Sequence, residues 1–339
     1  MPAPAPAQAP APALVPASPA APGVVASRPL VGGRVSIVLR GDGDAADLDR
    51  LAGHALDRFA AWASRLTRFD AASELSRLNA APAGRVAIGP TLTAVLDWAR
   101  LAEGLTDGLV DVSMLVERLA AEEGDAPGAH GARGAADATP AERGTPAGRR
   151  WGLTRGARGA FVSRPAGVRF DLDGVAKGWL ADRALALLPG RAAIVDGDGD
   201  IAGRVLPGGT WDLGIADPRD ASSRLAVVRV HPGALGRPDV AQAFGLATSG
   251  TSVHRWRHGT AEAHHLLDPR TRWPAVTDVV QATVLASSAR LAEAFAKVAI
   301  VAGSAEAFDR LDRPGVAGVL LLTDRGQVLA TAEMATWLV

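Results

Sequence analysis

Hydrophobic and polar positions alternate with two different periods along the first third of this chain. Residues 34–40 alternate every second position, which predicts a half-buried strand. From residue 45 to residue 66 apolar side chains recur at every third or fourth position, which predicts a long amphipathic helix. Ser73 then stands where a cap would begin a short helix, and another helix is expected over about 92–103.

The remaining two thirds predict a mixture of helices and strands without regular alternation. Helices are expected over 175–188, 288–302 and 305–311. Strands are expected over 167–170, 192–195, 212–215, 225–230, 281–285, 317–322 and 327–332. Such a mixture favours an α+β fold of mixed sheets with packed helices, in one large catalytic domain over 29–339, and disfavours a doubly wound parallel sheet.

Two segments lack the apolar period that packing needs. Residues 1–27 carry no charged side chain and alternate Ala with Pro, so we expect a disordered tail over 1–28. Residues 121–150 are rich in Gly, Ala, Pro and charge, which predicts a flexible insertion. The tail lacks the basic and apolar regions of a signal peptide, and no run long enough to span a membrane follows, so we predict a cytoplasmic protein.

Composition excludes several classes of function. The 36 basic and 36 acidic side chains balance, which disfavours a nucleic-acid-binding protein because such proteins cluster Lys and Arg. The absence of cysteine excludes disulfides, thiolate metal sites and a Cys nucleophile.

The densest candidate chemistry lies in residues 171–183 and 194–201. The first segment predicts a Gly turn that leads into a helix with Lys177 near its start, after Asp171 and Asp173. The second predicts a strand that ends in alternating Gly and Asp. Backbone N–H groups, a cation and carboxylates together suit a phosphate-bearing ligand with a divalent metal. The two Asp residues also fit ordinary helix caps.

Three further segments carry weaker signals. Residues 106–113 place two carboxylates around an Asp-Gly turn. Residues 247–251 offer small hydroxyls that suit a phosphate, while the absence of a Gly-x-Ser-x-Gly elbow disfavours a hydrolase triad. Residues 264–271 predict a rigid turn that presents His265, Asp268 and Arg270 to a site.

Six segments, in this order, resemble the ApbE-type FAD:protein FMN transferases. They are Ser-Glu-Leu-Ser-Arg-Leu-Asn at 73–79, Thr-Asp-Gly-Leu-Val-Asp at 106–111, Asp-Leu-Asp-Gly-Val-Ala-Lys-Gly at 171–178, Asp-Gly-Asp-Gly-Asp-Ile at 196–201, Ala-Thr-Ser-Gly at 247–250 and His-Leu-Leu-Asp-Pro-Arg-Thr-Arg at 265–272. The resemblance implies an ApbE-type fold. It also implies an enzyme that cleaves FAD, releases AMP and attaches FMN by a phosphoester bond to a Ser or Thr of an acceptor flavoprotein, with Mg²⁺ as cofactor.

The resemblance assigns roles to individual residues. His265 and Asp268 are expected near the reacting phosphates, one of them helping to deprotonate the acceptor hydroxyl. The expected FAD contacts are Phe69, which would stack on a ring, together with Leu109, Val110, Asp111, Asp171, Lys177, Thr248 and His265. The expected metal ligands are the carbonyl of Gly174 and the side chains at positions 293 and 297.

The chain departs from the family pattern at the metal ligands. Glu293 replaces an Asp and remains a carboxylate. Lys297 replaces a Thr, and an ammonium cannot coordinate a cation, so the two side chains also fit an ordinary ion pair one helical turn apart. Three functions therefore stay open: an FMN transferase, a non-catalytic FAD-binding protein of the same fold, and an FAD pyrophosphatase.

Overall fold

The computed structural model describes residues 23–41, 44–123, 150–157, 159–252, 255–258 and 261–339. Most of the predicted tail and of the predicted insertion therefore lies outside the described residues. In the described part, none of the helices is long and apolar enough to cross a membrane.

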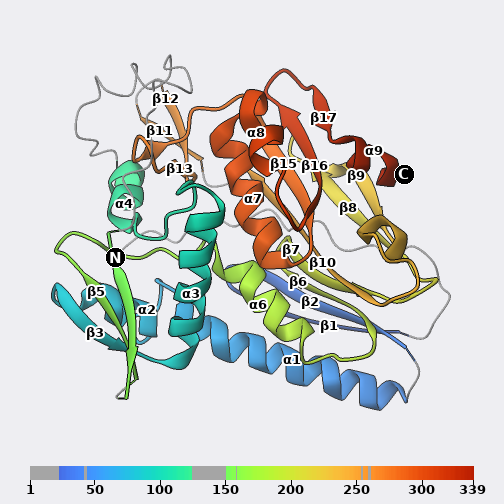
Figure 1. Ribbon diagram of the computed structural model, residues 1–339, viewed down its shortest axis with the longest axis horizontal. Coiled ribbons are helices and arrows are strands. Elements are labelled where there is room, and N and C mark those ends of the chain that lie inside the picture. Colours follow the sequence, from blue (N-terminus) through green and yellow to red (C-terminus); the bar gives the residue numbers. More distant parts are fainter. Residues whose placement is uncertain (1–22, 42–43, 124–149, 158, 253–254, 259–260) are drawn as a thin grey trace.

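An eight-stranded sheet forms the centre of the molecule (Figure 1). Its strand order is β1-β2-β6-β7-β10-β15-β16-β17, and all its neighbouring strands pair antiparallel. The strands are β1 (Gly23–Leu30), β2 (Gly33–Arg40), β6 (Ala192–Gly197), β7 (Asp200–Val205), β10 (Gln242–Gly250), β15 (Val279–Ala286), β16 (Val316–Thr323) and β17 (Val328–Ala330).

The alternation in the sequence decides which face of this sheet each side chain occupies. In β2, Val35, Ile37 and Leu39 are buried in the larger hydrophobic core, whereas Val38 belongs to a second core. Successive side chains of a strand point to opposite faces. The two cores therefore lie on the two sides of the sheet.

Helices cover the face with the larger core, where α1, α6 and α7 contact the strands (Figure 1). The helices are α1 (Ala45–Leu66), α2 (Glu74–Ala80), α3 (Pro90–Leu105), α4 (Leu115–Glu123), α6 (Ala176–Leu185), α7 (Ala289–Ala302), α8 (Ser304–Leu311) and α9 (Ala332–Trp337). Ser73 caps α2 as predicted, since its hydroxyl accepts the N–H of Ser76 at 2.9 Å.

A β-hairpin covers the other face. It consists of β8 (Trp211–Asp217) and β9 (Asp220–Val230), followed by a 3₁₀ helix at Pro232–Leu235. Its buried Trp211, Leu213 and Val228 belong to the second core, which α9 completes with Met334 and Trp337. This side holds apolar packing and none of the predicted site residues except Thr248 on β10.

Smaller sheets flank the main one. One is a three-stranded sheet of β3 (Gly84–Ile88), β5 (Gly159–Arg164) and β4 (Gly152–Gly156), beside α2 and α3 (Figure 1). The others are the pairs β11 (Arg255–His258) with β12 (Ala261–His264), and β13 (Leu267–Asp268) with β14 (Trp273–Pro274).

Helix α6 crosses the start of α7 at very short range, and this contact positions the site. A Cβ on Gly178 would lie 2.6 Å from the carbonyl oxygen of Ala289, so only glycine fits. Asp182 accepts the first N–H groups of α7, from Ala289 at 2.9 Å and Arg290 at 3.1 Å. The close approach at Gly178 is therefore one between two helices.

The α+β class is confirmed, and two local predictions are wrong. Residues 23–28 were predicted to belong to the tail, but they form most of β1, which pairs with β2 along its whole length. Residues 167–170 form no strand; Arg169 makes only an isolated bridge to Met114. The edge strand was missed because its composition continues that of the tail before it.

Candidate active site

A pocket opens where three of the resemblance segments meet. It is lined by residues 109–112, 171, 173–175, 265–267 and 269, together with Met114, Arg118, Lys297 and Val301. Its volume is about 90 Å³. Pockets that enclose drug-sized ligands measure roughly 300–1,000 Å³, so only part of a dinucleotide fits inside in this conformation.

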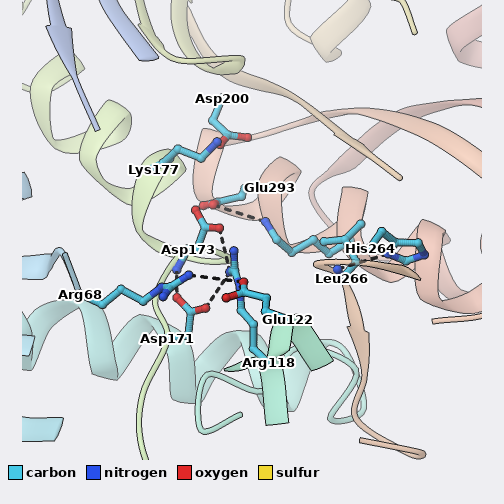
Figure 2. Close-up of polar contacts among 11 residues, drawn as sticks. Arg68, Arg118, Glu122, Asp171, Asp173, Lys177, Asp200, His264, Leu266 and Glu293 are labelled. Carbon is cyan, nitrogen blue, oxygen red and sulfur yellow. Dashed lines mark hydrogen bonds and ion pairs between the residues drawn. The ribbon is translucent and has the colours of Figure 1, made fainter. Parts of the chain in front are cut away.

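The turn before α6 faces Arg118 of α4. The Arg118 guanidinium donates to Asp171 Oδ2 at 2.7 Å and to Asp173 Oδ2 at 3.0 Å (Figure 2). Neither Asp caps α6, which begins after Val175 without a side-chain cap. Partial loss of hydration favours the neutral form of Asp173, but Lys177 and Arg118 outweigh it and hold its pKa well below the usual range.

Lys177 lies beside this turn and pairs with a carboxylate of the main sheet. Its ammonium is 3.1 Å from Asp200 Oδ2 (Figure 2). Burial favours the neutral amine, but Asp200 and Asp173 outweigh it and raise the pKa of Lys177 above its usual value. Lys177 therefore remains a cation next to the pocket.

The Gly/Asp-alternating segment forms the tight turn between β6 and β7. Asp196 accepts the N–H of Gly199 at 2.8 Å, and Asp198 has a left-handed backbone with φ of 68°. Burial raises the pKa of Asp196 to about 6, and the nearby carboxylates of Asp198 and Asp200 add to this shift. This turn concentrates negative charge behind Lys177.

Glu293 and Lys297 of α7 face the same turn before α6. Glu293 is fully buried, and its Oε2 accepts the N–H of Gly178 at 3.0 Å. Its Oε1 lies 3.6 Å from the Lys297 ammonium. Burial raises the pKa of Glu293 and Asp200 adds to the effect, while Lys297 and Lys177 oppose it.

The turn after β12 brings His265 to the pocket but keeps Asp268 inside the protein. Asp268 accepts from the Arg270 guanidinium at 2.8–3.1 Å, and the two side chains are 3% and 2% exposed. Arg270 also donates to the carbonyl of Val301 on α7 at 3.1 Å. Asp268 therefore fixes the turn, and the expectation that it faces the reacting phosphates is not supported.

Arg272 ends the segment 265–272 and contacts helix α4. Arg272 adopts a left-handed backbone with φ of 59°, a conformation that favours glycine. Its guanidinium pairs with Glu117 of α4, which also accepts from Arg150 at 3.3 Å. These contacts tie the turn to α4.

The segment 106–111 is both a turn and a wall of the pocket. Asp107 and Gly108 have positive φ values of 50° and 81°, and Asp111 accepts from the N–H and hydroxyl of Ser113 at 2.8 and 2.7 Å. Leu109, Val110 and Asp111 all line the pocket.

The structure gathers most, not all, of the predicted site residues. The pocket is lined by Leu109, Val110, Asp111, Asp171, Gly174, His265 and Lys297. Lys177 and Glu293 lie directly behind it. Phe69 and Thr248 are not among the lining residues: Phe69 is 82% exposed beneath Arg68, and the Thr248 hydroxyl bonds that of Thr283 at 2.9 Å.

Sequence reasoning missed Arg118, which pairs with both carboxylates of the turn before α6. The sequence near Arg118 indicates only an ion pair with Glu122 one helical turn later, which the structure shows at 3.0 Å. Such pairs are common on solvent-facing helices. Only the fold shows that Arg118 is 8% exposed and faces residues more than 50 positions away.

The implied metal ligands do not fit a divalent cation. Of Gly174, Glu293 and Lys297, the last offers an ammonium, which has hydrogen-bond donors and no lone pair. Across the described ranges, no group of three or more His, Cys, Asp or Glu side chains is placed to hold a metal ion.

Solved structures share this fold at low sequence identity. An ApbE protein from Thermotoga maritima superposes with a TM-score of 0.71 at 21% identity, over 93% of this chain and 99% of that one. A flavinyl transferase ApbE from Pseudomonas stutzeri gives 0.71 at 18% identity, over 94% and 97%. A flavin transferase ApbE from Vibrio cholerae gives 0.61 at 25% identity, over 94% and 99%.

Curated relatives match over shorter segments. An FAD:protein FMN transferase from Treponema pallidum is 30% identical over 191 residues, which are 52% of this chain and 50% of the relative. One from Rhodobacter capsulatus is 32% identical over 176 residues, 51% and 31% of the two chains. The chain thus spans half or less of the length of these two relatives.

The family model covers nearly all of the folded part. The model described as the ApbE family matches residues 31–320, a range that includes all six resemblance segments and every residue lining the pocket. The sheet, the pocket and this match agree, and the chain belongs to the ApbE family.

Proposed function

We propose that this protein is an FAD:protein FMN transferase. The observation that carries the proposal is the pocket, in which segments 109–112, 171–175 and 265–267 meet beside the cationic side chains of Arg118, Lys177 and Lys297. Curated relatives with this activity support it.

The proposed reaction is a phosphoryl-type transfer. The hydroxyl oxygen of an acceptor Ser or Thr forms a bond to the FMN phosphorus of FAD, and the bond from that phosphorus to the bridging oxygen breaks. AMP leaves with the bridging oxygen and its electron pair. The hydroxyl proton passes to a base, a role that we assign to His265 because it lines the pocket.

The residues around the pocket would act mainly by binding and orientation. Lys177 is a partly buried cation, and its ammonium would attract the phosphate charge that develops during transfer. The apolar side chains of Leu109 and Val110 would pack against part of the flavin nucleotide. Because the pocket is small, the rest of the dinucleotide would lie along its rim or require Arg118 to move.

The finer points of the proposal concern cofactor and compartment. Magnesium, which the resemblance implies, has no matching donor set at Gly174, Glu293 and Lys297. The acceptor is expected to be a protein, as the names of the relatives indicate, and the resemblance implies that it is a flavoprotein. The cytoplasmic location stays a prediction.

One incubation separates the three candidate functions. The protein is mixed with FAD and a flavoprotein that carries a candidate Ser or Thr, and the products are followed by mass spectrometry and nucleotide chromatography. AMP with an FMN-labelled acceptor supports the transferase. AMP with free FMN shows a pyrophosphatase, and intact bound FAD shows a carrier, the function that Lys297 in the metal position favours.

His265→Gln is the matched variant for the transfer step. It should slow labelling while FAD still binds, because the proton acceptor is lost but the phosphate contacts remain. Unchanged labelling would remove His265 from this role.

A further inference from the structure

Glu293 has both of its oxygens directed toward groups of this chain. It is 0% exposed, and Oε2 accepts the backbone N–H of Gly178 at 3.0 Å. Oε1 has no hydrogen-bond partner among the described residues and lies 3.6 Å from the ammonium of Lys297. A carboxyl group buried in this way is stabilised by a nearby positive charge, and here the cation facing Oε1 is Lys297.

The Lys297 side chain fills the space between α7 and the turn before α6. A Cβ on Gly174 would lie 3.1 Å from Lys297 Cε and 3.7 Å from its Nζ, so the end of the lysine packs against this glycine. The side chain is 18% exposed and lines the pocket together with Asp173. The ammonium thus lies between a buried carboxylate and the open pocket.

This arrangement is incompatible with a divalent ion in the same place. Mg²⁺ requires about six oxygen ligands at roughly 2.0–2.1 Å. Here one of the three implied ligands is a cation, one Glu293 oxygen already binds an N–H, and methylene groups occupy the space beside Gly174. A second positive charge next to the ammonium would also be repelled.

We propose that the Lys297 ammonium is the resident cation of this position, so that the protein binds no divalent ion between Gly174 and Glu293. The second half of the proposal rests on the proposed function: the same ammonium faces the phosphates of a bound dinucleotide and makes that binding independent of divalent metal. In both halves, the covalently attached ammonium of Lys297 takes the place of a metal ion from solution.

The first half is tested without FAD, by titrating Mn²⁺ and following the signal of the free ion by electron paramagnetic resonance. Wild type is expected to bind Mn²⁺ weakly. Lys297→Thr introduces an oxygen donor and removes the repelling charge, so it should bind Mn²⁺ at least about tenfold more tightly. Lys297→Met, which removes the charge without adding an oxygen ligand, is the control and should gain much less.

Two outcomes overturn the first half. One is wild-type protein that binds Mn²⁺ as tightly as Lys297→Thr. The other is folded Lys297→Thr, checked by circular dichroism, that gains no affinity over wild type. Lys297→Gln, which also offers an oxygen, replaces the Thr variant if the latter does not fold.

The second half is tested with FAD on the wild-type protein, by calorimetry in EDTA and in Mg²⁺. We expect the two affinities to agree within about twofold, and Lys297→Met to weaken binding about tenfold, the scale of one lost charged hydrogen bond. A tenfold loss in EDTA, or unchanged affinity in Lys297→Met, overturns this half. If FAD binds under neither condition, the proposed function fails, whereas the Mn²⁺ result stands unaffected.

Discussion

Two carboxylate–guanidinium groups lie near the pocket and differ in burial. Asp268 and Arg270 are 3% and 2% exposed, and they hold the turn after β12 against α7. Arg118 pairs with Asp171 and Asp173 at similar distances, but the side chain of Asp173 is 44% exposed to the pocket. The same ion-pair chemistry thus supports the fold inside the protein at Asp268 and stays accessible to solvent at Asp173.

The difference follows from what replaces water around each charge. In the buried Asp268–Arg270 pair, each charge has lost its hydration and is stabilised by the other. Removing one side chain therefore leaves an uncompensated charge inside the protein. At the pocket, the Asp173 side chain is 44% exposed, so it can exchange Arg118 for water or for a ligand at low cost. Burial therefore separates a positioning pair from a binding one, and this can be tested.

The largest loss of stability is expected when the buried Asp268–Arg270 pair is broken. Asp268→Ala would leave Arg270 buried without its carboxylate and should lower the free energy of unfolding by about 3–5 kcal/mol. Urea denaturation measures this. Asp173→Ala is the matched control and should cost less than about 1 kcal/mol, since its partner still has Asp171. Equal losses of unfolding free energy in the two variants would show that burial does not determine how much each ion pair stabilises the fold.

Next to the pocket, at Lys177, the effect should appear in ligand binding. Lys177→Met is expected to weaken FAD binding by about 1–3 kcal/mol through loss of a charged contact to phosphate. Calorimetry on folded protein gives the number. Arg183→Met removes a charge from the same helix at an exposed position, where the guanidinium stacks on Trp179, and should leave the affinity unchanged. Equal affinity in wild type and Lys177→Met would remove Lys177 from the binding site.

Asp196 shows what happens to a buried carboxyl that has other carboxylates beside it. Its folded pKa of about 6 lies above the unfolded value of about 3.9, so the native state favours the protonated form. That stabilisation is complete below about pH 4 and is lost as the pH rises through 6. Wild type is therefore penalised at pH 8.

Asp196→Asn should remove this penalty while its amide oxygen still accepts the N–H of Gly199. We expect it to stabilise the protein by roughly 1–2 kcal/mol at pH 8 and by less at pH 5. Urea denaturation at both pH values measures the difference. A stabilisation that does not change with pH would exclude titration as its cause.

The smallest effect on stability and on FAD affinity is expected at Phe69, which does not line the pocket. Because its ring is 82% exposed, Phe69→Ala should change the free energy of unfolding by less than about 0.5 kcal/mol. The affinity for FAD should also change little, since Phe69 does not line the pocket. A loss of about 1 kcal/mol in affinity would instead support the ring stacking that the family resemblance implies.

Periodicity was sufficient for most of the fold. The strand at 34–40 and the helices at 45–66 and 288–302 occur with ends within one residue of the prediction, because each buries one face against the same sheet. Strand β1 was missed because an edge strand beside a low-complexity segment has too few buried positions to show a period.

The candidate site was only partly predictable. Turns such as 106–111 and 171–174 were recognisable because Gly and Asp mark them locally, and the pocket confirms that they meet. The position of Asp268 was not predictable. A carboxylate in a turn has the same sequence pattern whether its side chain faces a ligand or, as here, a neighbouring arginine.

The sequence by itself determined the family, the order of the elements and the substitution of Lys297 for a possible ligand, because these depend on residue identity and local spacing. Only the tertiary structure decided that Arg118 faces Asp171 and Asp173, that Glu293 is fully buried, and that the end of Lys297 lies against Gly174. Those facts depend on how α4, α6 and α7 pack together. Burial and charge pairing arise between segments more than 50 residues apart, where no local pattern records them.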